Sequence, residues 1–421
     1  MKISRVAASA LTLALTLGTV GCGQASNNAN GKKITITLWY WNQSLSDQIL
    51  AQVDKAFPNV HFVAEKIGGN FESKLIASLY AGDAPDITGI NSADFVATMV
   101  KDHNQFVNLN QYPEVREAQK NYLGWKWNLA STPDHKYQVG IPIDTGPEVL
   151  YYNTQLFKKA GLPTDPAQVS EQMKTWSDYL AAGKQMKEKT GVPMVDDLTT
   201  IYQTALNQGK TNYFTPNMTP IYATNPVVKN AWDLVIQAHQ EGLSANIAEG
   251  TTSWSAGLSH NGFASFIGAS WEVPDLEQGD TRKGVWRVAA APGGPSDNGG
   301  SFLGVTKDSK HPELAAKIVL WILDAQHQTE MYPSLGLYPS TPASFPHLNQ
   351  PNAYFGGENI NKYFAACDKQ IKIAFQSPYD STVNGYFTQQ VSLIDSSNKN
   401  PEVAWKDAIN ESNSQMKRIL D

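Results

Sequence analysis

The chain has 421 residues, of which 41% are hydrophobic and 17% are charged, and its formal net charge at pH 7 is −6. Single hydrophobic cores stop growing at roughly 250–300 residues, so this length predicts two domains. The acidic balance argues against a nucleic-acid surface or a polybasic membrane patch, and no apolar run after the N-terminus approaches the roughly 20 residues that a transmembrane helix needs.

The N-terminus has the pattern of an export signal. A basic start leads into an apolar run at residues 6–20, which ends in Thr19-Val-Gly-Cys22. This ending resembles a bacterial lipobox, although threonine stands where leucine is usual, and it predicts cleavage before Cys22 and acylation of that cysteine. Residues 1–21 are therefore predicted as a lipoprotein signal peptide and residues 22–33 as a flexible polar tether. The alternative is an ordinary cleaved signal with an incidental cysteine.

The chain contains two cysteines. If Cys22 is acylated, Cys367 has no disulfide partner, and an exported protein without disulfides relies on its core for stability. Cys367 lies in a helical pattern and is predicted to be a small buried group.

The mature start predicts a parallel sheet with crossover helices. Residues 34–41 alternate as a strand, and a helix over residues 49–57 follows, with Ser44 and Asp47 at capping-box spacing. Strands and helices continue in turn, with a strand at 60–66, a helix at 71–80 and a strand at 86–90. In such sheets ligands bind beyond the carboxyl ends of the strands.

Residues 137–163 predict a crossing between two lobes. An apolar run at 139–143 meets a polar break that begins at Asp144, and a second run follows at 149–152. Pro142 and Pro147 lack an amide donor, which argues against one long central strand. Asn153 is suited to cap the helix that follows.

The remainder of the chain predicts further helices, strands and two more crossings. Helices are predicted at 176–190, 227–242, 312–325 and 401–420, and extended segments at 192–202, 263–267, 285–291 and 301–306. The turn-rich stretches 292–300 and 335–342 predict the second and third crossings. We expect the C-terminal helix to pack on the second lobe.

Eight segments carry a recognisable pattern and span nearly the whole mature chain. They are ITLWYW, FPNVHF, KLIASLYAGDAPDI, IPIDTGPEVLYYNTQLFKKAGLP, TWSDYLAAGKQMKEKTG, GFASFIGASW, GGSFLGVTKDSKHPELAAKIVLWIL and PEVAWKDAI. In these segments and their order the chain resembles the family 1 extracellular solute-binding proteins, the sugar-binding lipoproteins of ABC importers. The resemblance implies an α/β, two-lobe periplasmic-binding-protein-like fold of type II, with each lobe a mixed or parallel sheet flanked by helices. It implies three hinge crossings and lobes at 31–142 plus 300–338 and at 144–294 plus 341–421.

The resemblance also implies a function. The chain would be an exported monomer, held by the lipid on Cys22 at the outer face of the bacterial cytoplasmic membrane. It would capture a carbohydrate by hinge closure and deliver it to an ABC permease. A neutral oligosaccharide is expected, because the strand-end loops contain no Arg or Lys and the chain has 11 tryptophans. The alternatives are a secreted glycoside hydrolase, or the same fold with a non-sugar solute such as a phosphorylated polyol.

Motifs for catalysis and cofactors are missing from the sequence. Neither a complete phosphate-binding loop nor a nucleophile elbow nor HExxH occurs, and the eight histidines lack ligand spacing. We therefore expect no enzymatic activity, no cofactor, no metal and no nucleic-acid partner.

Sugar recognition needs aromatic rings for C–H faces and amides or carboxylates for hydroxyls. Trp271 matches a sugar-stacking tryptophan of the family, and Asp144 lies in the first crossing. Further candidates lie at strand ends, in loops and at the later crossings: Asn42, Gln43, Ser44, Trp41, Asp94, Tyr202, Gln203, Trp254, Ser301 and Tyr338. The alternatives are structural: Trp271 as a core residue, Asp144 as a turn residue and Ser44 as a helix cap. Trp254 is expected in a polar loop.

Overall fold

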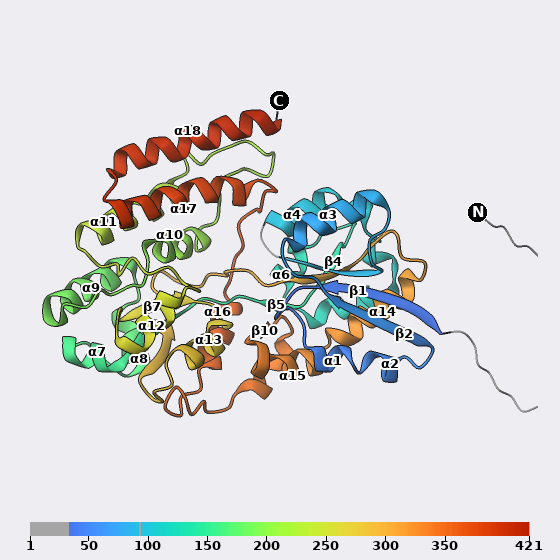
Figure 1. The fold of residues 1–421 in the computed structure, drawn as a ribbon, viewed down its shortest axis with the longest axis horizontal. Coiled ribbons are helices and arrows are strands. Elements are labelled where there is room, and N and C mark those ends of the chain that lie inside the picture. Colours follow the sequence, from blue (N-terminus) through green and yellow to red (C-terminus); the bar gives the residue numbers. More distant parts are fainter. Residues whose placement is uncertain (1–32, 92–93, 421) are drawn as a thin grey trace, which may run out of the picture.

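Two lobes joined by crossing segments make up residues 33–91 and 94–420, the part of the chain that the computed structural model describes (Figure 1). The strands are β1 (Ile34–Tyr40), β2 (Val60–Lys66), β3 (Ile87–Ile90), β4 (Gly140–Pro142), β5 (Asp144–Thr145), β6 (Val149–Asn153), β7 (Ser265–Gly268), β8 (Trp286–Ala290), β9 (Phe302–Val305) and β10 (Tyr338–Pro339). The sheet of the first lobe has the order β2-β1-β3-β9-β4 and that of the second lobe β7-β6-β8. The pair β10-β5 lies between them.

Helices flank both sheets. Those of the first lobe are α1 (Asp47–Leu50), α2 (Val53–Ala56), α3 (Phe71–Ala81), α4 (Asp94–Lys101), α5 (Pro113–Ala118), α6 (Gly124–Leu129), α14 (Pro312–Ile322) and α15 (Ala325–Leu335), with 3₁₀ turns at His103–Gln105, Leu109–Gln111 and Gln119–Asn121. Those of the second lobe are α7 (Thr154–Ala160), α8 (Pro166–Gln172), α9 (Trp176–Thr190), α10 (Leu198–Asn207), α11 (Pro226–Gln240), α12 (Thr252–His260), α13 (Glu272–Gly279), α16 (Asn361–Asp368), α17 (Asp380–Ser397) and α18 (Pro401–Leu420), with a 3₁₀ helix at Pro342–Leu348. Among the described residues, none of the helices has the length and apolar character that crossing a membrane requires.

The first strand separates two cores of the first lobe. Leu38 and Tyr40 pack in one cluster with residues of α1, α2 and α14, whereas Trp39 and Trp41 pack against the other, with residues of α3 and α4. Tyr40 therefore points away from Trp39 and Trp41, as the two-residue period of a strand requires. β2 and β3 pair in parallel with β1, as predicted, and β9 pairs antiparallel with both β3 and β4.

The second lobe is built around β6, which is buried along its whole length and pairs antiparallel with β7 and β8. Asn153 caps α7 as predicted, since its side chain accepts hydrogen bonds from the amides of Gln155 and Leu156. The C-terminal helix α18 packs on α17 and contributes Ala404 and Ala408 to the core of this lobe. That packing was predicted and is confirmed.

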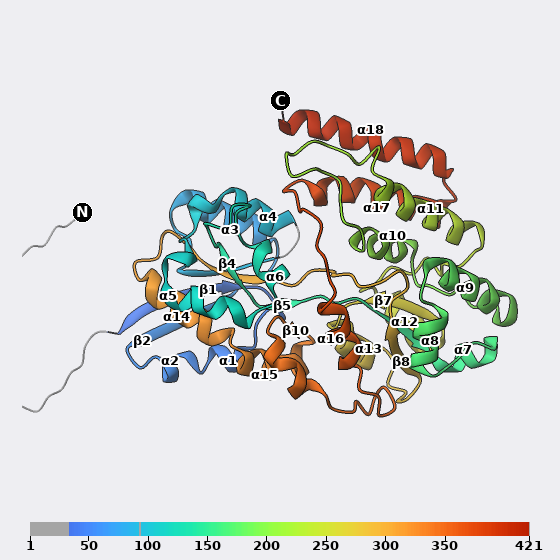
Figure 2. The same ribbon diagram turned by 180° about the vertical axis from the view of Figure 1, so that it is seen from behind.

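The crossing segments lie side by side between the lobes (Figure 2). β5 pairs antiparallel with β10. The amide of Ile143, just before β5, donates to the carbonyl of Ser301, just before β9, at 2.8 Å. Pro147 forms a β-bridge with Asp297. Segments from three distant parts of the sequence therefore hold one another where the chain passes between lobes.

Two local predictions are wrong. Residues 192–202 are not extended throughout, because Asp197 accepts a hydrogen bond from the amide of Thr199 at 2.7 Å and starts α10. The helix after β1 is split into α1 and α2, and its N-cap is Ser46. Asp47, expected in a capping box, instead accepts from Tyr40 and Lys66.

Cys367 is buried, as expected from the sequence. Cys367 is a free, buried cysteine in α16, and its Sγ lies 3.3 Å from the carbonyl oxygen of Ser296. The predicted signal peptide, Cys22 and most of the predicted tether lie outside the described residues.

Candidate functional site

A pocket opens where the two lobes and the crossings meet, and it is called the hinge pocket below. Its cavity volume is about 280 Å³. It is lined by Trp41, Asn42, Gln43, Ser44, Asn91, Asp144, Trp271, Pro274, Asp275, Asn298, Gly300, Ser301, Ser334, Leu335 and Leu337. The hinge pocket thus draws on the loop after β1, the start of α13 and all three crossings. Seven predicted site residues meet here: Trp41, Asn42, Gln43, Ser44, Asp144, Trp271 and Ser301.

The loop after β1 presents two exposed amides to this pocket. Ser44 is buried and donates to the carbonyl of Trp41 at 2.8 Å, which closes the turn. Gln43 has a φ of 64°, in the left-handed region, and like Asn42 it is exposed. The Trp41 ring packs so closely on Gly89 that a Cβ there would lie 2.6 Å from it. A fixed ring and two free amides therefore stand together at the end of β1.

Asp144 is the buried carboxylate of the hinge pocket. It is 2% exposed, and its Oδ1 accepts a hydrogen bond from the Ser301 amide at 2.7 Å. Burial raises its pKa to about 7, while Lys126 and the Ser301 amide act in the opposite direction and Asp297 raises it further. This carboxylate is thus close to the balance point between its charged and neutral forms at neutral pH.

Trp271 lies on the crossings, directly before α13. A Cβ on Gly146 would lie 2.5 Å from the Trp271 ring, so only glycine lets the first crossing approach it this closely. The neighbouring Ser270 donates to the carbonyl of Gly336 in the third crossing at 2.6 Å. The ring is partly exposed and held in place by two crossings, which suits an aromatic platform for a ligand.

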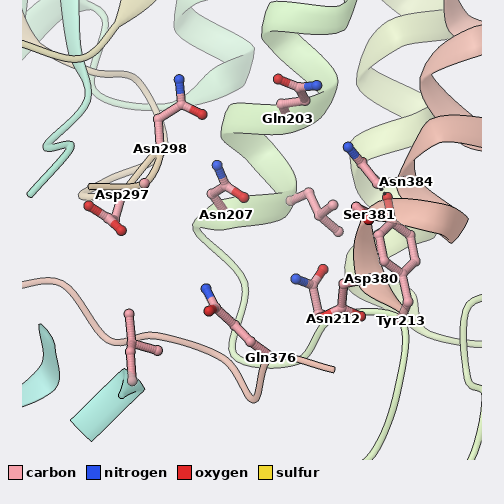
Figure 3. A pocket seen from close by; sticks show the side chains of 13 residues that line it. Gln203, Asn207, Asn212, Tyr213, Asp297, Asn298, Gln376, Asp380, Ser381 and Asn384 are labelled. Atoms are coloured by element: carbon pink, nitrogen blue, oxygen red, sulfur yellow. Dashed lines mark hydrogen bonds between the residues drawn. The ribbon is translucent and has the colours of Figure 1, made fainter. Parts of the chain in front are cut away.

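A second cavity, of about 220 Å³, lies beside the second crossing and is rich in amides (Figure 3). We call it the amide pocket. It is lined by Leu129, Gln203, Leu206, Asn207, Asn212, Tyr213, Asp297, Asn298, Gly299, Gln376, Asp380, Ser381 and Asn384. Asn298 lines both pockets. Within the described part of the chain, Asn212 Oδ1 and Gln376 Oε1 are buried without a hydrogen-bond partner.

The remaining predicted residues whose side chains the structure describes lie away from the hinge pocket. Gln203 lines the amide pocket. Tyr202 is fully buried, its hydroxyl is 3.0 Å from that of Tyr213, and its ring stacks on Phe387. Tyr202 and Gln203 were predicted to contact the same ligand, but they are successive residues of α10, and one side chain points to the core while the other points to a cavity. The side chain of Asp94 lies outside what the structure describes.

Two other predicted aromatics are core residues. Trp254 is on helix α12, not in a polar loop, it is 1% exposed, and its indole N–H donates to Asp196 Oδ2 at 2.9 Å. Tyr338 is fully buried, packs on Phe345 and Phe364, and donates to a backbone carbonyl at 3.3 Å. Neither side chain reaches the hinge pocket, because each already has its polar partner and its ring contacts inside the lobe.

Several residues of the site were missed by sequence reasoning. Asn298 lies in the turn-rich stretch that marks the second crossing, so its position could have been found there. Asp275 follows Trp271 by about one helical turn in α13, and burial raises the pKa of its carboxyl group. Lys126 is fully buried in α6 and donates to the carbonyl of Gly299 at 2.6 Å. A lysine between two tryptophans gives no sequence signal for such a role.

The donor set of the site is suited to polar, uncharged ligands. Among the described residues, no group of three or more His, Cys, Asp or Glu side chains could hold a metal ion. The hinge pocket combines one ring on each side, amides and carboxylates, which are hydrogen-bonding groups for hydroxyls. The arrangement can bind a polyhydroxylated molecule and contact it from both lobes.

Comparison with known proteins assigns the chain to a family. The model of the bacterial extracellular solute-binding protein family matches residues 48–353. The chain belongs to this family. It is similar to an arabinooligosaccharide-binding protein of Bacillus subtilis, at 25% identity over 80% of this chain and 81% of that protein. It is also similar to a lactose-binding protein of Rhizobium radiobacter, at 21% identity over 92% of this chain and 94% of that protein.

Solved structures show the same fold. A crystal structure of an extracellular solute-binding protein of family 1 aligns with a TM-score of 0.85 and 26% identity, over 90% of this chain and 99% of that chain. The galacto-N-biose-/lacto-N-biose I-binding protein of an ABC transporter from Bifidobacterium longum, in complex with lacto-N-biose, aligns with a TM-score of 0.74 and 21% identity. That alignment covers 92% of this chain and 98% of that chain. The predicted fold class and family resemblance are confirmed.

Proposed function

We propose that this solute-binding protein captures a neutral oligosaccharide in the hinge pocket and presents it to an ABC permease. The observation that carries the proposal is the convergence of Trp271, Asp144 and the loop after β1 on one cavity between the lobes. The names of the relatives support the carbohydrate class, because they bind arabinooligosaccharides, lactose and lacto-N-biose.

The chemistry of the hinge pocket supports a sugar over other solutes. Trp271 and Trp41 offer rings for the C–H faces of a pyranose or furanose, and Asn42, Gln43 and Asp144 offer groups for its hydroxyls. No Arg or Lys lines the hinge pocket among the described residues, which argues against a phosphorylated ligand. A buried carboxylate such as Asp144 also rejects ligands without a matching hydroxyl, because its unpaired oxygen would lose on the order of 1–3 kcal/mol.

Ligand capture would be coupled to movement of the lobes. The hinge pocket takes residues from both lobes, so a ligand that touches both favours the conformation in which they are close. The short paired segments at the crossings are the places where such a rotation can be absorbed. The permease would recognise this closed conformation.

The cellular context is part of the same proposal. We infer an exported monomer that stays at the outer face of the cytoplasmic membrane through a lipid on Cys22. It acts without catalysis or a cofactor. Metabolic labelling with a palmitate analogue tests the anchor: wild-type protein should take up label, a Cys22→Ala variant should not, and equal labelling of both would contradict it.

The carbohydrate claim is tested by thermal-shift screening of purified mature protein against a panel of mono- and oligosaccharides. We expect at least one oligosaccharide to raise the melting temperature, because a ligand that binds only the native state stabilises it. The same samples are analysed for products. A panel without any shift would sink the proposal, and turnover of an oligosaccharide would indicate a glycoside hydrolase instead.

A further inference from the structure

A buried lysine lies beside the crossings without lining the hinge pocket. Lys126 of α6 is fully buried, and its Nζ donates to the carbonyl of Gly299 at 2.6 Å. It also lies 4.7 Å from the centre of the Phe302 ring, at the start of β9. Burying a lone ammonium group is costly, so this position requires nearby compensation.

Carboxylates from three elements compensate Lys126. Asp297, Asp144 and Asp368 each favour its charged form, in this order of strength, against the burial that lowers its pKa. Each carboxylate is itself tied to a crossing. Asp297 accepts from the Gly146 amide at 2.8 Å, and Asp368, at the end of α16, accepts from the Thr145 hydroxyl at 2.8 Å. Together with Asp144, these groups form one buried charge cluster around Lys126.

The cluster holds the segment that carries three residues of the hinge pocket. Asn298, Gly300 and Ser301 line the pocket, and Gly299 lies between the first two. Lys126 holds the Gly299 carbonyl, and Asp144 holds the Ser301 amide at 2.7 Å. Gly300 has a φ of 88°, and a Cβ on it would lie 2.4 Å from the Asp144 carbonyl oxygen and 2.8 Å from Lys126 Nζ. Lys126 and Asp144 therefore fix the segment from both sides, and only glycine fits at position 300.

We propose that Lys126 is a positioning residue for ligand recognition: it fixes the second crossing through Gly299, and this segment in turn holds the Asp144 carboxylate through the Ser301 amide, aligned for a ligand hydroxyl. This proposal rests on the proposed function. Lys126 does not line the hinge pocket and acts through Asp144 and the backbone. An ionised carboxylate accepts stronger hydrogen bonds than a neutral one, so the charge on Asp144 sets the affinity.

The charges around Asp144 predict how the affinity for sugar depends on pH. The pKa of Asp144 is about 7, with Lys126 lowering it and Asp297 raising it. Sugar affinity should therefore rise as pH increases through about 7. Removing the cation moves the midpoint of this rise to higher pH, whereas neutralising Asp297 moves it to lower pH. A purely structural lysine would change stability without moving the midpoint in this way.

The experiment measures the dissociation constant of a sugar found in the panel, by calorimetry, from about pH 5 to about pH 9. The variants are Lys126→Met and Asp297→Asn, whose side-chain oxygen can still accept from Gly146. Lys120→Met is the matched control, because Lys120 is exposed and pairs only with Glu117 among the ion pairs of the described residues. We expect Lys126→Met to shift the midpoint up by about one pH unit and to weaken binding about fivefold at pH 7. Asp297→Asn should shift it down, and Lys120→Met should match the wild type.

The outcomes separate this proposal from the proposed function. If a folded Lys126→Met variant keeps the wild-type affinity and midpoint, the positioning role is overturned, while a loss of binding in Trp271→Ala still supports the site. If Lys126→Met does not fold, the Asp297→Asn profile decides: a downward shift supports the charge cluster, and an unchanged midpoint overturns it. If the wild type binds no sugar at all, both proposals fail together.

Discussion

The surroundings of Trp254 and Trp271 differ although both tryptophans lie at the start of a helix. Trp254, in the first turn of α12, is 1% exposed, packs on Phe263 and Phe266, and donates its indole N–H to buried Asp196. Trp271, just before α13, rests on Gly146 of the first crossing and remains partly exposed in the hinge pocket. The Trp254 ring is covered entirely by residues of its own lobe, whereas part of Trp271 remains exposed to the pocket. A ligand can cover the exposed part of a tryptophan that lies at a lobe boundary.

The largest effect on stability should come from the core tryptophan. Trp254→Ala removes a fully buried ring and leaves Asp196 without its indole partner, so the free energy of unfolding should fall by about 3–5 kcal/mol. Urea denaturation of the sugar-free protein measures this. The folded variant should bind sugar within about twofold of the wild type. If the variant instead kept the stability of the wild type and lost affinity for sugar, Trp254 would be a ligand contact and not a core residue.

Asp144 should give the sugar-free protein a measurable pH dependence. Its pKa rises from 3.8 to about 7 on folding because of burial, so its stabilising contribution is present below about pH 4 and is lost as pH rises towards 7. The free energy of unfolding of the wild type minus that of Asp144→Asn should therefore fall by a few kcal/mol across this window. Denaturation at several pH values checks the slope, and a difference that rises with pH would contradict the assignment.

Trp271 should affect ligand binding and not stability. Trp271→Ala is expected to weaken sugar binding about 30-fold, on the order of 2 kcal/mol, because an aromatic anchor in a central pocket carries much of the binding energy. Its free energy of unfolding without sugar should change by less than about 1 kcal/mol, since the ring is partly exposed. Calorimetry and urea denaturation of the same preparation test both parts. Unchanged affinity would remove Trp271 from the site.

The smallest effect should come from the neighbouring pair on α10. Gln203 lines the amide pocket, whereas Tyr202 is in the core and shares a hydrogen bond with Tyr213. Gln203→Ala should change sugar affinity less than about threefold. Tyr202→Phe should leave affinity unchanged and lower the free energy of unfolding by about 1 kcal/mol. An affinity loss above tenfold in Gln203→Ala would instead extend the ligand site into the amide pocket.

Sequence reasoning works best where the signal is local. Asn153 marks the start of α7, and the alternation in β1 gives the opposite directions of Tyr40 and Trp41, because caps and strand periodicity depend on neighbouring residues. The loop after β1 and the first crossing could be assigned to one site on the same grounds. They lie at the ends of strands and at breaks in the pattern, where side chains are free to meet.

The errors arise where burial depends on partners from far along the chain. Trp254 is in the core because Asp196 and Phe266 meet it, and Tyr202 because Phe387 does. None of these partners is visible in the residues around the tryptophan or the tyrosine. Lys126 is the opposite case, since a charged residue is exposed by default and only a cluster of distant carboxylates can make its burial possible.

The place of β9 in the first lobe has a consequence for biogenesis. This strand, Phe302–Val305, lies between β3 and β4, so the first sheet cannot be completed until residue 305 has left the ribosome. Such long-range pairing slows folding. A nascent chain whose sheet is incomplete stays unfolded for longer, and an unfolded chain can pass through a translocation channel. The interleaved lobe therefore favours export before folding, and we expect the native state to form on the far side of the membrane.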